Sequence, residues 1–338
     1  MTSRLARVDR RPTMVDVARE AGVALRTVSR VVNGESNVNP ELAQRVRAVI
    51  ETLGYRPDER ARQLRSGSSG TIGAAVRGVG GVWQRAAERA AREASLMLLS
   101  ASTEDDEELY GRVIELLCRR RVDGLIVEAI GAPTPYLKAE VAAGLPVVAV
   151  DRRMSDIDTD SVLSDSESGI QSAFAYLADR GHRRIAYVGD SERISTGRAR
   201  AEAMRACIRS AGRHSPADLV RTGDIDQSFV GSALDALLSA AQPPTALITG
   251  NFMATRHVLR HLGSGIEQIA LIGFDDIDNV DLMQTPVTVV AQDWDAIGRT
   301  AMELLTTRIA NPDAPRVHRV LPVELIVRHS SEVPAPAR

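Results

Sequence analysis

Apolar residues recur at helical spacing in three short stretches near the start of the chain. The stretches run from Thr13 to Gly22, from about Leu25 to Val32 and from Asn39 to Gly54. Thr13 is a good helix cap with Asp16 three positions later, and Asn39 stands directly before Pro40. A glycine ends the first and third stretches, as is common at the ends of helices. The pattern predicts a small all-α domain of three helices.

The pattern changes after Thr71, where short β-rich runs alternate with amphipathic stretches. The expected strands are Ile72–Val76, Leu96–Ser100, Gly124–Val127, Pro146–Val150, Ile185–Val188, Ala246–Thr249 and Ile269–Gly273. The expected helices between them include Leu109–Arg120, Ser168–Arg180 and Ala199–Ala211. Such alternation is typical of parallel sheets with crossover helices. At least seven strands over 268 residues favour two α/β lobes rather than one.

A run of serine and glycine from Ser66 to Gly70 separates the two patterns and indicates a flexible linker. Before it, Pro57-Asp58 is suited to cap a short fourth helix that extends through Arg65. We therefore divide the chain into four parts. These are an N-terminal tail (1–12), a helical head (13–57), a hinge helix with its linker (58–70) and an α/β body (71–338).

Composition narrows the class of protein. The chain has 338 residues, of which 44% are hydrophobic and 25% charged, so it is neither disordered nor collagen-like. No apolar run approaches the ~18 residues of a membrane span. Residues 1–12 hold four arginines and no apolar segment, so we expect no secretory signal. Only two cysteines occur, Cys118 and Cys207, which fits a reducing cytoplasm and argues against a disulfide scaffold or a four-cysteine zinc site.

Charge is distributed unevenly along the chain. Residues 1–70 carry 13 Arg and 8 acidic residues, a balance of +5, whereas the remaining residues have a balance of −7. A basic head on an acidic body suggests that the head meets a polyanion.

The composition of the second helix points to DNA as that polyanion. A short helix, a glycine turn and a second helix describe a helix-turn-helix. One face of the second helix presents Leu25, Arg26, Ser29, Arg30 and Asn33, while valines point inward. Arginine matches the O6/N7 pair of guanine, and serine and asparagine suit phosphate oxygens.

The residues 13–57, TMVDVAREAGVALRTVSRVVNGESNVNPELAQRVRAVIETLGYRP, resemble the DNA-binding head of the lac/galactose repressor (LacI/GalR) family. The resemblance is nearly gapless through Leu64. It implies that Leu25 and Arg26 read bases in the major groove. It also implies register-holding contacts to phosphates or base edges from Thr27, Ser29, Arg30 and Asn33. Ala24 departs from the family, which usually has serine there, and the lost hydroxyl should weaken the helix cap by about 1 kcal/mol.

Residues 58–65, DERARQLR, resemble the hinge helix of the same family. In the family this segment folds on DNA, and a leucine wedges into the minor groove at the operator centre; Leu64 holds that position. An apolar wedge unstacks one base step and kinks the duplex. The alternative is that Leu64 packs against the body.

The body resembles the family's effector domain, which has a two-lobed periplasmic-binding-protein-like fold. The resemblance rests on RRVDGLIV (120–127), LPVVAVDRR (145–153), GHRRIAYVGD (181–190), STGRARAEAMRA (195–206), IALIGFDDID (269–278) and TPVTVVAQD (285–293). We accordingly expect one lobe from residues 71–166 with 291–321, and the other from 167–290 with 322–338.

Ligands of open α/β sheets bind at the carboxyl ends of the strands, which here face the cleft between lobes. The resemblance places five effector-binding candidates there: Asp151, Arg198, Asn251, Asp275 and, more weakly, Gln292. Carboxylates, amides and guanidinium groups suit a polyol because each can satisfy two hydroxyls. The alternative for each acid is a helix cap or a salt bridge.

Two departures from the family concern the effector. The loop after the first body strand, VRGVGGVWQRAAERA, keeps an aromatic residue only at Trp83, and its glycines from Gly78 to Gly81 leave it open. Phe252 stands where the family prefers Asp or Asn. An unusual ligand, or a repressor that ignores small molecules, therefore stays open as an alternative.

Other chemistries have little support. The string Gly78-x-Gly80 lacks the third glycine of a dinucleotide loop, because Trp83 stands there. His257 and His261 are spaced to share a metal on a helix, but no Glu or Cys completes a known ligand pattern. The chain has no G-x-S-x-G, and its only lysine, Lys138, lies in no phosphate-binding loop. We expect no cofactor, no metal and no enzyme.

These features predict a sequence-specific transcriptional regulator, a repressor, that binds a pseudo-palindromic operator in double-stranded DNA as a homodimer. A small polar effector, a sugar or sugar derivative, would control it by allostery. We expect a cytoplasmic protein without membrane contact. The alternative is a solute-binding protein of a sugar transport system, which would share the body but would need a secretory signal and lack the head.

Overall fold

The structure is a computed structural model that describes residues 12–35, 37–56, 68–104, 106–130, 134–212, 215–277 and 280–336. The chain divides into two compact units, residues 1–69 and 70–338. The expected hinge helix (58–65), including Leu64, lies outside the described residues.

The first unit contains the three expected helices, α1 (Met14–Ala21), α2 (Leu25–Val32) and α3 (Pro40–Leu53). Thr13 and Asp16 form the expected capping box, and Asn39 caps α3. Gly22 and Gly54 end α1 and α3 with φ of 61° and 63°, where a side chain would be strained. The three helices bury one apolar core that includes Val17, Val28, Val46 and Tyr55.

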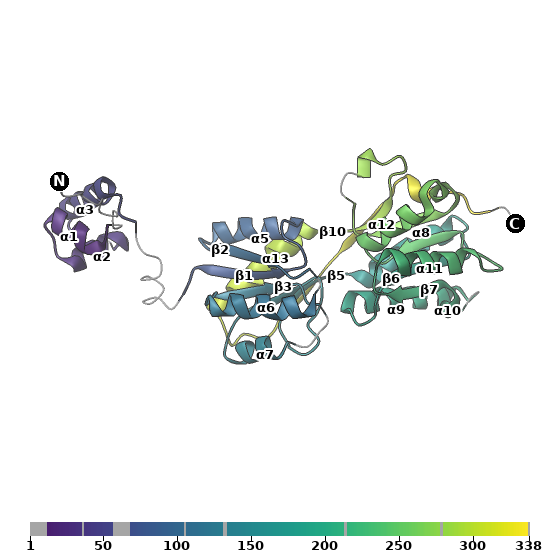
Figure 1. Ribbon diagram of the computed structural model, residues 1–338, viewed down its shortest axis with the longest axis horizontal. Coiled ribbons are helices and arrows are strands. Elements are labelled where there is room, and N and C mark those ends of the chain that lie inside the picture. The colour runs from purple at the N-terminus through teal and green to yellow at the C-terminus, as the bar shows by residue number, and fades with distance from the viewer. Residues whose placement is uncertain are drawn as a thin grey trace, which may run out of the picture. The chain divides into compact units, whose positions relative to one another are not determined.

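The first sheet of the body has six strands in the order β11-β5-β4-β3-β1-β2. Their bounds are Thr71–Val76 (β1), Met97–Ser102 (β2), Gly124–Val127 (β3), Val147–Val150 (β4), Asp160–Ser164 (β5) and His318–Leu321 (β11). Helices α5 (Val82–Glu93) and α13 (Trp294–Ala310) cover one face, and α6 (Glu107–Arg119) covers the other, near α7 (Pro135–Ala142) (Figure 1). Because both faces are covered, β3 and β4 are buried throughout and β1 is buried after Thr71.

The second sheet has the order β12-β10-β9-β8-β6-β7. Its strands are Ile185–Asp190 (β6), Val220–Gly223 (β7), Ala246–Thr249 (β8), Ala270–Phe274 (β9), Thr288–Gln292 (β10) and Val323–Ile326 (β12). Its helices are α8 (Ser166–Asp179), α9 (Ser195–Ala211), α10 (Pro216–Leu219), α11 (Gln227–Leu238) and α12 (Phe252–Leu262). The expected parallel pairing is confirmed for the described strand pairs except β10 with β12, which is antiparallel.

The two sheets repeat one topology. Strands β5-β4-β3-β1-β2 of the first correspond in order to β10-β9-β8-β6-β7 of the second. Each sheet is completed by a strand from the C-terminal part of the chain, β11 or β12. The two lobes therefore present equivalent strand ends to each other.

The described chain passes between the lobes three times, and each passage is one residue long. Asp165 joins β5 to α8, Asp293 joins β10 to α13, and Pro322 joins β11 to β12. Both aspartates also cap the helices that follow them, through hydrogen bonds to Ser168 N and Ala296 N.

Close helix packing holds the first lobe together across a long sequence separation. At the contact between α5 and α13, a Cβ on Gly298 would lie 2.1 Å from the carbonyl oxygen of Trp83. Glycine is therefore required there for the two helices to approach. Among the described residues, no helix has the length and apolar character needed to cross a membrane.

Candidate functional site

Helix α2 presents the polar face expected of a DNA-reading helix. Leu25 has 49% of its surface exposed although it is apolar, and Arg26 is exposed beside it. Val28 and Val31 on the opposite face are buried against α1 and α3. An exposed leucine next to an arginine at the start of a helix leaves both side chains available to base edges in a major groove.

Two features of α2 affect the DNA contacts expected from the sequence. Ala24 occupies the N-cap position in extended conformation and makes no side-chain cap, as the sequence predicts. The Nε of Arg30 donates to Glu35 at 2.9 Å, and its Nη2 donates to the carbonyl of Asn37 at 3.2 Å. Arg30 therefore stabilises the turn after α2, which leaves only part of its guanidinium for phosphate.

In the body, Asp151 and Asp275 directly follow β4 and β9. Both have left-handed backbone, with φ of 63° and 71°. The Asp151 amide donates to Val162 O at 3.0 Å, and the Asp275 amide donates to Val290 O at 2.9 Å. Non-glycine residues in this region are strained, and such strain is concentrated at functional sites.

Arg77 and Glu128 surround Asp151 in the first lobe. Arg77 follows β1, and its guanidinium lies 3.8 Å from both the Glu128 and the Asp151 carboxylates. Glu128 follows β3 and accepts hydrogen bonds from the Trp83 indole (2.7 Å) and the Arg77 amide (2.6 Å). Arg152, which is buried, lies 3.7 Å from Asp151. The lobe thus gathers two carboxylates and two guanidinium groups at its strand ends.

Asp190, Asn251 and Gln292 lie at the strand ends of the second lobe. Asn251 donates to Asp190 at 2.7 Å, while its own carbonyl caps α12 through Ala254 N. The amide nitrogen of Gln292 donates to Asp275. The side-chain oxygen of Gln292 is buried and has no hydrogen-bond partner among the described residues, so it can still accept one.

Burial sets the electrostatics of this cluster. Burial raises the pKa of Glu128, although the charge and the backbone amide of Arg77 oppose the shift. Burial likewise raises the pKa of Asp190, against the opposing charges of Arg152 and Arg200. Since Arg152 belongs to the first lobe, Asp190 feels charge across the cleft. The lobes also touch directly, where the Arg153 amide donates to Ser195 Oγ at 3.1 Å.

The structure does not bring Arg198 into this cluster. Arg198 is exposed, and its Nε donates to the Glu192 carbonyl at 3.0 Å. Arg200 instead lies buried, with 3% of its surface exposed, and its guanidinium stacks 3.6 Å from the centre of the Phe274 ring. Its Nη1 donates to Gly250 O at 2.6 Å and its Nε to Ser166 Oγ at 3.2 Å. These partners are neutral, and Nη2 makes no hydrogen bond to the described residues.

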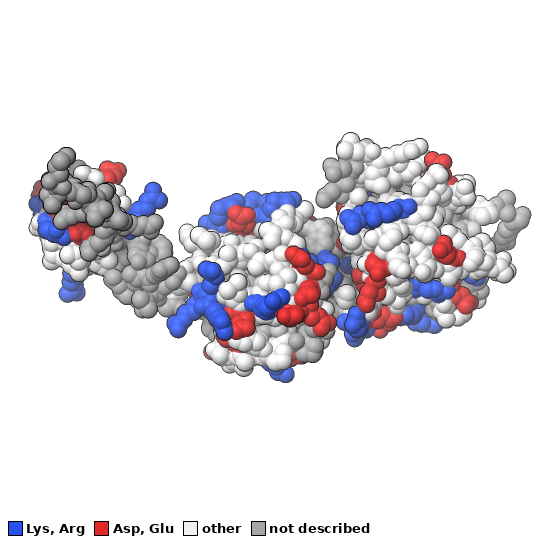
Figure 2. Space-filling view, viewed as in Figure 1, with Lys and Arg blue, Asp and Glu red and all other residues white. Residues whose placement is uncertain are grey.

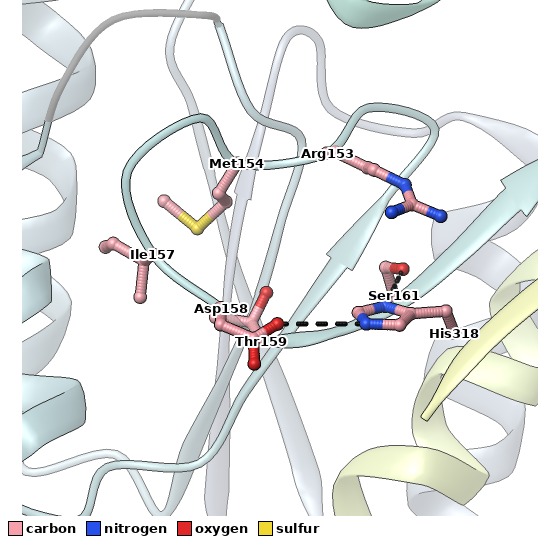
Figure 3. A pocket seen from close by; sticks show the side chains of 7 residues that line it. All are labelled: Arg153, Met154, Ile157, Asp158, Thr159, Ser161 and His318. Carbon is pink, nitrogen blue, oxygen red and sulfur yellow. Dashed lines mark hydrogen bonds and ion pairs between the residues drawn. The ribbon is translucent and has the colours of Figure 1, made fainter. Parts of the chain in front are cut away.

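A cavity of about 80 Å³ lies under the loop after β4, lined by Arg153, Met154, Ile157, Asp158, Thr159, Ser161 and His318 (Figure 3). His318 bonds Ser161 at 2.9 Å and lies 3.7 Å from Asp158. The volume is well below the ~300 Å³ of small ligand pockets. Figure 2 shows carboxylates on both sides of the furrow between the lobes on the face drawn.

The two histidines with metal-like spacing face different partners on α11. His257 bonds Gln227 at 2.9 Å, and His261 bonds Asp235 at 3.0 Å. No group of three or more potential metal ligands occurs among the described residues. Phe252 begins α12 directly after Asn251.

Comparison with known proteins assigns the chain to a family. Residues 13–58 match the model for bacterial regulatory proteins of the lacI family, and residues 174–331 match the periplasmic binding protein-like domain. The ribose operon repressor of Escherichia coli (strain K12) is 33% identical over 309 residues, which cover 89% of this chain and 94% of that protein. The chain belongs to the lacI family. It is therefore a DNA-binding transcriptional regulator.

Other similar proteins match over nearly the full length of the chain. The HTH-type transcriptional regulator PtxS of Pseudomonas aeruginosa is 34% identical, covering 95% of this chain and 96% of that protein. The lac repressor dimer bound to operator and an anti-inducer has the same fold, with a TM-score of 0.81 at 24% identity, covering 95% and 99% of the two chains. A transcriptional regulator CelR–cellobiose complex aligns with a TM-score of 0.69 at 26% identity, covering 95% and 100%.

Sequence reasoning missed five members of this cluster, which are Arg77, Glu128, Arg152, Asp190 and Arg200. The signal for Arg77, Glu128 and Asp190 was available, because each stands at the carboxyl end of an expected strand, as Asp151 does. Arg200 could not be separated from Arg198 by spacing alone, since both lie on α9 and only the packing of that helix decides which one is buried.

Proposed function

We propose that this regulator represses transcription as a homodimer on a pseudo-palindromic operator, and that a small polyhydroxylated effector bound between its lobes controls it. One arrangement of side chains in the structure supports the proposal. Polar side chains from both lobes converge on the strand ends of the cleft, in a chain that also has an exposed DNA-reading helix.

For the DNA, α2 supplies the contacts. Leu25 and Arg26 would read base edges. Contacts to phosphates or base edges that hold the register would come from Thr27, Ser29 and Asn33. Arg30 would add fewer such contacts, because part of its guanidinium is bonded to Glu35 and Asn37. Two-fold symmetry of a homodimer requires a two-fold operator, with half-sites about one helical turn apart. Leu64 would kink the central step as a minor-groove wedge, as its position in the sequence suggests.

The hydrogen-bond acceptors in the cleft indicate the chemical class of the effector. Asp151, Asp190 and Asp275 keep lone pairs after their internal hydrogen bonds, and Gln292 keeps its side-chain oxygen. These acceptors suit the hydroxyl donors of a sugar. The Nη2 of Arg200, which makes no hydrogen bond to the described residues, would donate to a ring or hydroxyl oxygen in return. We retain Asp151, Asn251, Asp275 and Gln292 as effector contacts and propose Arg200 in place of Arg198.

The relatives are consistent with a carbohydrate. One is named a ribose operon repressor, and another was solved with cellobiose. A regulator with this role needs no catalytic group, and it would act in the cytoplasm where its operator lies. Binding can move operator affinity only by as much as the effector distinguishes the two lobe arrangements.

Selection of random and genomic DNA on the purified full chain, at fixed salt, tests the proposal. We expect enrichment of a pseudo-palindrome, and release of that DNA by one member of a panel containing D-ribose, cellobiose and lactose. An enriched site without two-fold symmetry would refute the homodimer. A palindrome released by no member of the panel, in a chain that binds none of them by calorimetry, would refute the effector class.

A further inference from the structure

A single guanidinium near the C-terminus ties together both ends of the loop that follows β9. Arg328 Nη1 and Nη2 donate to the two carboxylate oxygens of Asp276, at 2.7 and 2.9 Å. The same Nη1 donates to Val287 O, the residue before β10, at 2.9 Å. A bidentate guanidinium fixes orientation as well as distance. One side chain therefore bridges Asp276, at the start of the loop, and Val287, at its end.

The backbone of Arg328 is itself anchored. Its amide donates to Thr288 Oγ1 at 2.7 Å, and that hydroxyl donates to the Arg328 carbonyl at 2.8 Å. Ser330, which is fully buried, accepts from Thr288 N and donates to Leu271 O in β9. The backbone around Arg328 is therefore anchored to β9 and β10, and this fixes the position from which the Arg328 side chain reaches Asp276.

Asp276 and its neighbour Asp275 have different partners. Asp275 directs its carboxylate to Gln292 and adopts the left-handed backbone, whereas Asp276 directs its carboxylate to Arg328. Asp276 also accepts the Ile277 amide at 2.8 Å, which fixes the first turn of the loop. With its next residue fixed in this way, Asp275 cannot relax to an extended backbone without breaking the Arg328 contact.

We propose that Arg328 is a positioning residue that holds Asp275 in its left-handed backbone conformation and so aims its carboxylate at Gln292. The consequence for effector binding rests on the function proposed above. In the first lobe, the equivalent Asp151 has the same backbone conformation but different neighbours. There the residue after Asp151 is the buried Arg152, and Asp151 itself faces Arg77 and Arg152.

Hydrogen exchange of the full chain tests this inference without any ligand. The Asp275 amide donates to Val290 O, and in Arg328→Gln we expect it to exchange about tenfold faster or more, since the conformation that protects it opens more often. Asp276→Asn should give a similar increase in the exchange rate. Arg328→Lys keeps the charge but not the bidentate guanidinium, so it should give a smaller increase. The Asp151 amide, with the same geometry in the first lobe, is the internal control.

A matched control separates this effect from general loss of an ion pair. Arg119 pairs with Glu115 at 2.6 Å on α6 of the first lobe, and Arg119→Gln should leave the Asp275 amide unchanged. If the Asp275 amide of folded Arg328→Gln and Asp276→Asn exchanges at the wild-type rate, the inference is wrong. If the Asp151 amide accelerates equally, the effect is global destabilisation and the inference is also wrong.

Titration with D-ribose then distinguishes the two proposals. Where wild type releases its operator with D-ribose, Arg328→Gln should need about tenfold more sugar, while its sugar-free operator affinity stays within about twofold. An unchanged D-ribose requirement alongside faster Asp275 exchange would overturn the link to the effector. A wild type that ignores D-ribose counts against that sugar in the proposed function, and the exchange result still decides the role of Arg328.

Discussion

Asp151 and Asp275 occupy the same place in the two lobes. Each follows the fourth strand of the repeated topology, each has positive φ, and each donates its amide to a valine carbonyl on the neighbouring strand, Val162 or Val290. An extended backbone at either position would point the side chain elsewhere. The repeated strain therefore aims one carboxylate from each lobe at the space between them.

Replacing either aspartate by asparagine should weaken binding of the effector and leave the fold unchanged. Asparagine tolerates the left-handed region, so the backbone is retained while the charge is lost. We expect a loss of about 1.5–3 kcal/mol in effector affinity for each of Asp151→Asn and Asp275→Asn, as for hydrogen bonds to charged groups. Isothermal titration with the sugar that releases the operator measures it. Glu303→Gln, on the exposed face of α13, is the control. Affinity equal to wild type in both variants would remove the pair from the site.

Arg200 and Arg198 offer a direct comparison on one helix. Arg200→Gln removes a buried guanidinium that stacks on Phe274, and we expect the operator to be released only at about tenfold or higher sugar concentration. Arg198→Gln changes an exposed side chain and should leave the dose–response curve within about twofold of wild type. The curves are measured by fluorescence anisotropy on labelled operator. The reverse pattern would restore Arg198 as the effector contact.

Arg26→Ala should relax sequence preference. The side chain is exposed at the start of α2, and loss of a bidentate base contact costs about 1–3 kcal/mol at the specific site. Affinity for scrambled DNA should fall much less. The two affinities are compared at one salt concentration, with Arg47→Ala on α3 as an exposed arginine outside the reading helix. Equal losses on specific and scrambled DNA would mean that Arg26 contacts only phosphate.

Arg308→Ala should destabilise the body strongly. Arg308 makes two hydrogen bonds to Asp160 at 2.8 and 2.9 Å and others to the carbonyls of Pro312 and Pro315. Both side chains are buried, so removing one leaves an uncompensated charge and costs about 3–5 kcal/mol. Urea unfolding measures the loss. Arg92→Ala breaks an exposed pair with Glu88 and should cost less than about 1 kcal/mol; equal losses would show that burial does not matter here.

The same pair predicts a pH dependence. Burial raises the pKa of Asp160, but the hydrogen bonds from Arg308 and from the Val317 amide outweigh it, so the pKa lies below its usual value. Because the folded pKa is below the unfolded one, this contribution is present above about pH 4 and is lost as pH falls through the folded pKa. Urea unfolding from pH 7 to pH 3 should show a steeper acid loss in wild type than in Arg308→Ala. Parallel curves would contradict the assignment.

The head could be predicted from sequence almost to the residue. Its helix ends depend on local chemistry, namely the hydroxyl of Thr13, the Asn39-Pro40 pair and the glycines that adopt positive φ. Such signals act within one turn of the chain. The apolar runs of β1, β3 and β8 were equally clear, because a strand buried on both faces needs little else.

The strands that sequence analysis did not predict gain their structure from pairing. β5 (DSVLS) and β11 (HRVL) carry polar residues, and they become strands because they pair at one side of the first sheet. Arg200 differs from Arg198 only through the phase of α9 against the lobe. Glu128 follows an expected strand, but its hydrogen bonds to Trp83 and Arg77, about fifty residues earlier, could not be predicted from that position. Each of these depends on contacts between distant segments.

The three single-residue passages between the lobes determine the order in which the body can form. Neither lobe is a continuous segment: the sheet of the first lacks β11, and its helix layer lacks α13, until residue 321 has been added. During synthesis, the first 95 residues of the body (71–165) can therefore build only an incomplete layer with part of its apolar face uncovered. The body must close late, after β12 (Val323–Ile326) has left the ribosome, whereas the core residues described for the head all lie at or before Tyr55.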